Sequence, residues 1–493
     1  MSILGLHSNS PMPTQSGVSH RNRTANPQRF CLQLFLTYIM RFAILTFVPA
    51  LLVTALTSQE NVLLPGSLSF PIGVLTDSQG LVYTTSKGDG ASVGGELAVY
   101  DPATNTQSAI ASNLATVNIP AGHPVGAHHM SWNPTQAGVV TLVNGASGLL
   151  EDIDVATGQV VGGSVDMRSF VVSSGYPDSN SYSVAYDGAG NRYVADSGAN
   201  AVFKVDPSGS IAIFAQFPNL ANNGPPQVGQ QFVPTKILAD GSGGFWVSGF
   251  SGGPFFAGTA RVAHVSASGS ITYPFTSLTT IIDIAINPVD GSLYALSFGG
   301  FDPAAGQFIP GTGEILKLGG GVSDVVLSGL NMPTGMSFTP AGDLYYVEWF
   351  GPLGPGDGSM SRLVAGRVEV VGAGCGGLQL SSSGQAAIGN SMWLDITGGA
   401  AGSSLMAISA SMGGCAGPGV QLPTPLFALG CEAYILSSAV SIGSFINTPA
   451  GSVIIVVPSN PLFIGLQICA QAGAADSLGF RSSNGLDITI GAL

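Results

Sequence analysis

Polar side chains recur in similar segments of this 493-residue chain, at positions where they could form a metal site or a ligand site. One group ends an expected aromatic strand and contributes carboxylate or amide oxygens. A second group directly precedes an apolar strand residue and contributes a histidine, a lysine and a carboxylate. Together the two groups contain His129, Asn144, Asp196, Lys236, Asp283 and Glu348. Hard cations such as calcium bind oxygen ligands of this kind.

Two interpretations of these residues are open. One is a calcium site formed by the three carboxylates and Asn144. Such a site would suit a calcium-dependent lactonase of the gluconolactonase type, acting at the mouth of the central channel that a ring of repeats would enclose. However, Lys236 would lie beside Asp283 and repel a cation, which favours an ion pair between neighbouring repeats. In that second interpretation Asp196 and Asn200 bond to the backbone of their turn, and no cofactor is expected.

A histidine cluster offers a further metal site, because imidazoles bind transition metals. Its members are His123, His128 and His129. Neighbouring residues on a strand point to opposite faces, so His128 and His129 cannot both face one ion unless the strand bulges. We therefore expect structural roles for them. The chain contains no G-x-S-x-G, Walker or H-E-x-x-H motif that would indicate hydrolase, nucleotide or zinc chemistry.

The elements that would position these residues form a repeat of about 50 residues. Each unit contains an apolar strand, a tight turn, an aromatic strand, a variable loop and a third strand, as in SYSVAYDGAGNRYVADSGANAVFKVD from Ser181. The apolar anchors of the first strands are Val74, Met130, Val184, Ile237, Ile284 and Met336. Four antiparallel strands at this period are typical of a propeller blade, and blades stack in a ring because one alone cannot bury both sheet faces. We predict an all-β fold with a six-bladed β-propeller over residues 62–371.

The last repeat contains its own third and fourth strands, MSRLVA from Met360 and RVEVV from Arg367. A ring of four-stranded sheets can then close without a strand from the N-terminus. We therefore predict that residues 367–371 complete the last blade.

Long glycine-rich loops between the second and third strands carry aromatic side chains. These include Phe255, Phe256, Phe301, Trp349 and Phe350. Aromatic loops on a rigid scaffold commonly form a binding surface, and His129 and Lys236 would lie at the channel mouth on the same face. Alternatively, these rings pack the loops onto the propeller. The sequence leaves both interpretations open.

Blades three to six resemble a known family of secreted propellers. The segments GFSGGPFFAGTARVAHV from Gly249, TTIIDIAINPVDGSLYAL from Thr279 and YVADSGANAVFKVDPSG from Tyr193 are similar to the ScyD/ScyE family and to the wider NHL-type repeats. The resemblance covers roughly residues 65–371. Blade two departs from it, because HHMSWNPTQAGVVTLVN lacks the usual turn and aromatic residue. The resemblance implies a propeller fold and export, and it implies no established catalytic residues.

The composition changes beyond Gly372, where charged residues become rare. Apolar segments such as SVIIVVP alternate with Gly, Ser and Pro turns, which predicts a small antiparallel β-sandwich over residues 375–493. The segments IGNSMWLDITGGAAGSSLMAIS, PSNPLFIGLQ and SSNGLDITIGAL resemble a C-terminal module of secreted planctomycete proteins, which has no assigned chemistry.

Four of the five cysteines lie in this last part of the chain, and the 300 residues before it contain none. They are Cys375, Cys415, Cys431 and Cys469. Four cysteines in one small exported segment predict two disulfides, for which three connectivities are available.

The N-terminus has the features of a leader. Met40 and Arg41 precede the apolar run FAILTFVPALLVTAL and a small-residue exit near Ser58, which predicts a signal peptide over residues 40–58. Residues 1–39 are then a non-native extension. The alternative is a membrane anchor over Phe30 to Thr57, which is long enough to span a bilayer.

Charge narrows the classes of partner. Without the leader, ten basic and 27 acidic side chains give a net charge of −17, with no basic cluster to bind phosphates. Nucleic acid is therefore not an expected partner, and no membrane association is expected after signal cleavage. We expect an exported, monomeric, non-catalytic propeller, secreted or periplasmic, that binds an extracellular or cell-surface ligand through its long loops.

Overall fold

Strands dominate the part of the chain that the structure describes. The computed structural model describes residues 61–62, 68–89, 94–118, 124–219, 230–349, 358–399, 405–417, 419–422, 431–435, 439–446, 448–476 and 479–493. The expected leader at residues 1–39 and 40–58 lies outside these ranges, as do Phe350 and His123. Within the described ranges, no helix is both long and apolar enough to cross a membrane.

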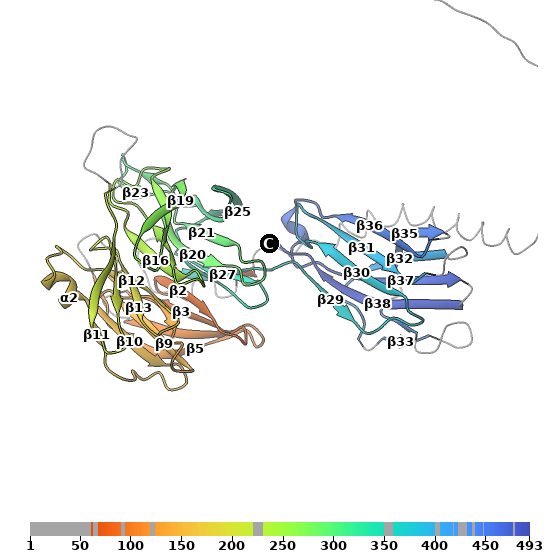
Figure 1. The fold of residues 1–493 in the computed structure, drawn as a ribbon, viewed down its shortest axis with the longest axis horizontal. Helices are drawn as coiled ribbons and strands as arrows, with labels where there is room; N and C mark the ends of the chain where they lie inside the picture. The colour runs from red at the N-terminus through yellow and green to blue at the C-terminus, as the bar shows by residue number, and fades with distance from the viewer. Residues whose placement is uncertain are drawn as a thin grey trace, which may run out of the picture. The chain divides into compact units, whose positions relative to one another are not determined.

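Six four-stranded antiparallel sheets account for most of the described residues before residue 364 (Figure 1). The first three sheets contain β2 (Pro71–Thr76), β3 (Val82–Ser86), β4 (Gly95–Asp101) and β5 (Thr106–Leu114); β8 (Ala127–Trp132), β9 (Val139–Asn144), β10 (Leu149–Asp154) and β11 (Val165–Asp166); and β12 (Ser181–Tyr186), β13 (Arg192–Asp196), β14 (Ala201–Val205) and β15 (Ile211–Gln216). A short helix, α2 (Met167–Ser173), follows β11.

The other three sheets have the same order, with one exception in the last. They contain β16 (Pro234–Ala239), β17 (Phe245–Gly249), β18 (Ala260–Val265) and β19 (Ile271–Leu278); β20 (Ile281–Ile286), β21 (Leu293–Ser297), β24 (Gly313–Gly319) and β25 (Val322–Leu330); and β26 (Pro333–Phe338), β27 (Leu344–Trp349), β28 (Gly358–Leu363) and β1 (Asn61–Val62). Two small ribbons, β6 (Val117–Asn118) with β7 (Pro124–Val125) and β22 (Phe301–Asp302) with β23 (Gln307–Phe308), extend from loops.

The six first strands face one another around a common axis. Each of β2, β8, β12, β16 and β20 contacts the first strand of the next sheet, and β26 contacts β2 again. Each pair of neighbouring sheets also encloses its own apolar cluster. For example, Tyr193 and Phe245 pack between the third and fourth sheets. This arrangement is that of a β-propeller, in which every sheet buries both faces against its neighbours.

The sixth sheet corrects the predicted ring closure. Its fourth strand is β1, which pairs antiparallel with β28 through Asn61↔Arg362 and Val62↔Ser361. The segment RVEVV forms β29 (Arg367–Val371), which pairs with β38 (Gly479–Thr489) of the second part of the chain. The prediction was wrong because an outer strand is fixed only by its hydrogen-bonding partner, and partners distant in sequence leave no local pattern.

Each first strand is irregular at one equivalent place. Its pairing with the second strand shifts register directly before the apolar anchor, as between Pro234 and Lys236 or between Ile281 and Asp283. The same shift occurs in the other four first strands. A bulge re-aims the side chain that follows it. In β8, β16 and β20 the residues before the anchors, His129, Lys236 and Asp283, come within 4.0 Å of one another.

The described residues of the second part of the chain form two larger antiparallel sheets and one small ribbon, β33 (Val420–Gln421) with β34 (Glu432–Ala433). One sheet contains β29, β38, β37 (Gln467–Asp476), β32 (Leu405–Met412) and β35 (Val440–Ile446), and the other contains β30 (Gln379–Gly384), β31 (Ser391–Thr397) and β36 (Ala450–Val456). One apolar cluster draws on both sheets, with Leu394 and Ile396 from β31 and Ile408 from β32. The 3-10 turn η1 (Pro461–Phe463) is a further short element.

Two disulfides join the four cysteines of this second part. Cys375 bonds to Cys431, and Cys415 bonds to Cys469. The structure thus selects one of the three connectivities that the sequence allowed. Disulfides of this kind persist in oxidising compartments outside the cytosol.

Candidate functional site

Three ionisable side chains from three different sheets meet inside the propeller. Lys236 on β16 donates from Nζ to His129 Nδ1 on β8 at 3.2 Å, and the same Nζ lies 3.5 Å from Asp283 Oδ1 on β20. His129 Nδ1 is 4.0 Å from Asp283 Oδ2. His129 and Asp283 are both 0% exposed and Lys236 is 5% exposed. We call this group the channel triad.

Backbone groups and an aromatic ring hold the triad in place. Asp283 Oδ2 accepts the N–H of Met336 at 2.7 Å, and Oδ1 accepts the N–H of Ile284 at 2.8 Å. The ring of Tyr182 lies 5.6 Å from the ring of His129. In the described part of the chain, His129 Nε2 is buried and has no hydrogen-bond partner.

Burial is the main influence on the protonation of Asp283 and His129. It raises the pKa of Asp283 to about 6, although Lys236 and the two backbone N–H groups act in the opposite direction. Burial, together with the positive charge of Lys236, holds the pKa of His129 well below its ordinary value. His129 is therefore neutral at physiological pH, and its Nδ1 can accept the hydrogen bond from Lys236.

The depth of the triad differs from the prediction. The sequence placed these residues at the mouth of the channel, on the side of the long loops, but His129 and Asp283 lie fully buried within it. The bulges of β8, β16 and β20 direct three side chains toward one point, and the first strands around that point leave His129 and Asp283 no exposed surface.

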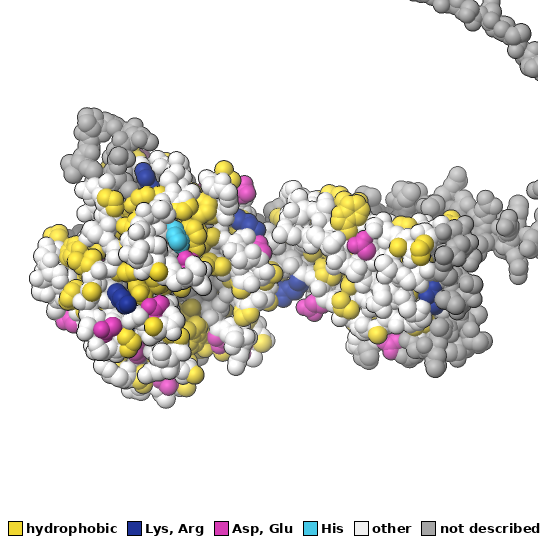
Figure 2. Space-filling view, viewed as in Figure 1, with side chains coloured by type: hydrophobic (Ala, Val, Ile, Leu, Met, Phe, Trp, Pro, Cys, Tyr) yellow, Lys and Arg dark blue, Asp and Glu magenta, His cyan; other side chains and the backbone are white. Residues whose placement is uncertain are grey.

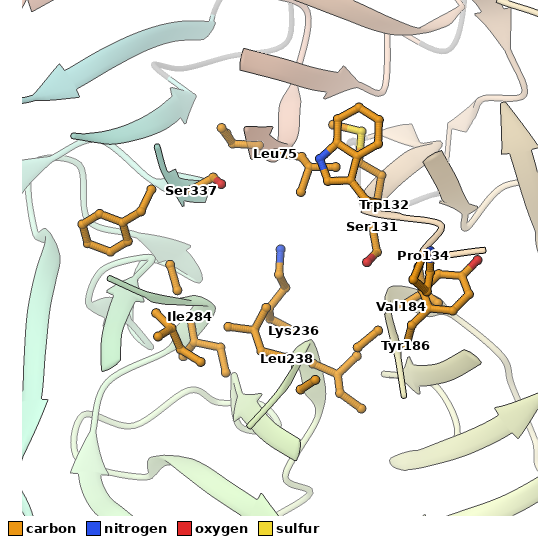
Figure 3. A pocket seen from close by; sticks show the side chains of 18 of the residues that line it. Leu75, Ser131, Trp132, Pro134, Val184, Tyr186, Lys236, Leu238, Ile284 and Ser337 are labelled. Carbon is orange, nitrogen blue, oxygen red and sulfur yellow. The ribbon is translucent and has the colours of Figure 1, made fainter. Parts of the chain in front are cut away.

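A cavity of about 530 Å³ occupies the channel beyond the triad. Most of its lining comes from the second halves of the first strands, including the apolar anchors. Lys236 lines this cavity, and in Figure 3 its amine points toward the centre of the ring of lining side chains, which include Leu238, Ile284 and Trp132. Pro134 and Gly188 also line the cavity and are exposed, so it reaches the surface near the first turns, away from the long loops.

The other expected calcium ligands do not join the triad. Asp196 accepts two serine hydroxyls and two backbone N–H groups at 2.7–3.0 Å. Asn144 accepts the N–H of Ala146 at 2.9 Å, and Glu348 accepts that of Asn331 at 2.7 Å. Each side chain is thus engaged with a loop of its own. Among the described residues, no three His, Cys, Asp or Glu side chains are placed to hold one metal ion.

His128 is also engaged with backbone. Its Nδ1 lies 2.9 Å from the carbonyl oxygen of Ser181, and its ring stacks on Tyr182 at 4.3 Å. The strand does bulge between Ala127 and Met130, which was the condition for His128 and His129 to face one ion. Nevertheless, the two rings make different contacts, with Ser181 and with Lys236.

The loop aromatics largely pack against one another. One cluster has ring centroids 4.8–5.8 Å apart and consists of Phe250, Phe255, Phe298, Phe301 and Phe308. Trp349 lies 5.1 Å from the ring of Phe70. Phe256, at 40% exposed, is the member of the predicted set that faces solvent, and Phe350 lies outside the described residues. The packing interpretation therefore accounts for Phe255, Phe301 and Trp349.

Sequence reasoning missed the residues that follow the anchors. Trp132, Tyr186 and Leu238 lie two or one positions beyond an anchor and line the cavity. At the two positions that follow the anchor, most residues of the six repeats are apolar or aromatic, which is also the signal of ordinary core residues. Only the ring of strands shows that these positions enclose a space.

Comparisons with known proteins give a weak likeness confined to solved structures. No protein-family model matches the sequence, and no curated protein matches it. A selenomethionine form of virginiamycin B lyase from Staphylococcus aureus is 15% identical, over 59% of this chain and 81% of that chain, with a TM-score of 0.37. A gluconolactonase from Xanthomonas campestris is 13% identical, over 58% and 82%, with a TM-score of 0.34. A protein of unknown function from Bacteroides thetaiotaomicron is 10% identical, over 62% and 72%, with a TM-score of 0.42. Identities and scores this low transfer no activity and no residue role.

Proposed function

We propose that this chain is an exported six-bladed propeller with an appended β-sandwich, and that it binds a small, mostly apolar molecule in the channel cavity. The observation that carries the proposal is the amine of Lys236, which points toward the centre of a mostly apolar cavity of about 530 Å³ (Figure 3). The lining also contains polar residues, namely Ser131, Tyr186, Asp187 and Ser337. Ligand sites usually have this size and this combination of an apolar lining with a few fixed polar groups.

The polar end of the ligand would be a hydrogen-bond acceptor. An ammonium group carries three N–H donors. Two of them are directed at His129 Nδ1 and Asp283 Oδ1, which leaves one for a ligand in the cavity. A carboxylate, sulfonate or carbonyl oxygen would fit this donor, and the remaining ligand surface would lie against the apolar anchors.

The channel cavity is a better candidate binding site than the long loops, because the aromatic side chains of the loops mostly pack against one another. Binding a ligand in the cavity requires no catalytic group. A calcium-dependent lactonase is the less favoured function, because Asp196, Asn144 and Glu348 each bond to a separate loop.

A fluorescent probe tests the cavity. The dye 1-anilinonaphthalene-8-sulfonate joins apolar rings to an anionic group, and its emission rises on transfer to an apolar site. We expect saturable binding, an affinity about tenfold lower in Lys236→Met through loss of one charge-assisted hydrogen bond, and loss of binding in Ser131→Trp, which fills the cavity.

The control is Lys204→Met, because Lys204 lies over the ring of Tyr193 outside the cavity. Dye binding that is unchanged in both Lys236→Met and Ser131→Trp would place the dye elsewhere and refute the proposal.

Export is supported by the two disulfides, which form in oxidising compartments. Charged side chains are also few and scattered on the face shown in Figure 2. N-terminal sequencing of protein recovered from outside the cytoplasm should begin between Leu56 and Gln59, as the signal-peptide pattern requires. An intact sequence upstream of Met40 would contradict it.

A further inference from the structure

We propose that the amine of Lys236 condenses reversibly with an aldehyde or ketone group of the ligand to form an imine. The inference rests on the proposed function, since the ligand must occupy the channel cavity. It adds a covalent step and a chemical class, a carbonyl compound with an apolar body.

The geometry supplies the three conditions that imine formation needs. The nucleophile is accessible from the cavity, because Lys236 lines it and its amine points toward the centre (Figure 3). A group that can take its proton lies 3.5 Å away, at Asp283 Oδ1. A second group, His129 Nδ1 at 3.2 Å, accepts one N–H and orients the amine.

Asp283 is the base that would take a proton from the Lys236 amine as the nitrogen attacks, since its Oδ1 lies 3.5 Å away. Burial makes Asp283 a stronger base than an ordinary carboxylate, because its pKa is raised to about 6. His129 is neutral and acts as a positioning residue.

The step balances without an oxidant or a reductant. The Lys236 nitrogen attacks the carbonyl carbon, a C–N bond forms, and the carbonyl oxygen takes the proton that Asp283 holds. The resulting carbinolamine loses its hydroxyl group with a second proton as water, and a C=N bond replaces the C–O bond. One carbonyl compound and one amine give one imine and one water, and hydrolysis reverses the reaction.

Three other lysines in the described part of the chain serve as internal references. Lys317 is paired with Asp290 at 3.0 Å, and Lys204 lies over a tyrosine ring. Lys87 is the lysine that competes most strongly with Lys236 for a carbonyl compound, because burial lowers its pKa to about 8. If a lowered pKa alone decided reactivity, Lys87 would react first. If access from the cavity and contact with the triad decide reactivity instead, Lys236 will react first.

The experiment is reductive trapping on the full exported chain. The protein is incubated with benzaldehyde and sodium cyanoborohydride, and peptide mass spectrometry follows benzylation at each lysine over time. We expect Lys236 to be labelled first, and we expect Asp283→Asn to slow its labelling about 100-fold, the lower end of what a positioned acid–base group contributes. Labelling of Lys204 and Lys317 should be unchanged in that variant.

Faster labelling of Lys87, or equal labelling of all lysines, would overturn the proposal. The variant His129→Asn should also slow labelling, and the Lys317→Met variant should not. Binding of the sulfonate dye separates the two proposals. Dye binding without selective labelling refutes the imine alone, whereas absence of dye binding refutes the cavity function itself.

Discussion

Replacing Lys236 by methionine should make the stability of the propeller depend on pH in a way that reports the channel triad. In the native protein the lysine charge opposes the effect of burial on Asp283, whose pKa is about 6. Without that charge the pKa of Asp283 rises further, and the carboxyl group keeps its proton to higher pH in the folded state than in the unfolded chain.

The sign and the size follow from proton linkage. Above pH 6 the native wild-type carboxyl and the unfolded carboxyl are both ionised, so Asp283 adds no slope. In Lys236→Met the native state holds one extra proton, so stability falls as pH rises. One proton corresponds to about 1.4 kcal/mol per pH unit. The loss caused by Lys236→Met should therefore grow between pH 6 and pH 9, by up to about 4 kcal/mol over three units.

The other titratable groups around the triad do not produce this difference. Burial lowers the pKa of His128 to about 3, holds that of His129 well below its ordinary value, and raises that of Tyr182 far above neutrality. All three stay neutral across the range. Lys87, with a pKa of about 8, titrates in wild type and variant alike, and its contribution largely cancels in their difference.

Urea unfolding at pH 6, 7, 8 and 9 measures the effect, in a Trp393→Phe background so that the propeller tryptophans alone report. Two controls accompany it. The Lys236→Met/Asp283→Asn double variant should lose the extra slope, because no carboxyl remains. Lys317→Met breaks a pair whose side chains are 34% and 33% exposed, and it should cost less than about 1 kcal/mol at every pH. A loss from Lys236→Met that is constant from pH 6 to pH 9 would refute the coupling of Lys236 to Asp283.

Three further predictions address the fold and the metal alternative. Proline at both Asn61 and Val62 should destabilise the propeller by about 1–3 kcal/mol in a thermal melt followed by tryptophan fluorescence, because β1 loses the N–H that it donates to β28, whichever of the two residues carries it. An equal effect from Val370→Pro, on β29, would contradict the observed closure. Replacing Cys375 and Cys431 by serine should destabilise the C-terminal module by about 2–5 kcal/mol, and a matching loss in the propeller transition would argue against separate cores. Micromolar calcium should leave the melting temperature unchanged, because the expected oxygen ligands are engaged separately; a rise that EDTA reverses would restore the calcium-dependent hydrolase.

Much of the fold could be predicted because its information is local. Alternating apolar residues, Asp-Gly turns and aromatic second strands specify each hairpin from neighbouring residues, and all six predicted anchors lie in the first strands of the six sheets. The repeat alignment also brought Lys236 and Asp283 into adjacent positions, since equivalent residues of neighbouring blades face the same axis. The structure places them 3.5 Å apart.

The depth of the site could not be predicted in the same way. The side chain before each anchor could lie at the mouth of the channel or inside it. Its depth depends on the bulge before the anchor and on the distance between the six first strands. Similarly, Phe255 and Phe301 could not be assigned to packing or to binding, because a ring in a glycine-rich loop has the same sequence signal in both roles.

The sequence by itself determined the strands, their grouping into units of four, the change of composition near Gly372 and the number of disulfides, because each depends on residue type and short-range order. Only the tertiary structure decided which strand closes the last sheet, which cysteines pair, and that His129, Lys236 and Asp283 meet at the end of a mostly apolar cavity. These features join residues more than 45 positions apart, and such contacts are selected by the packing of the whole chain rather than by any local pattern.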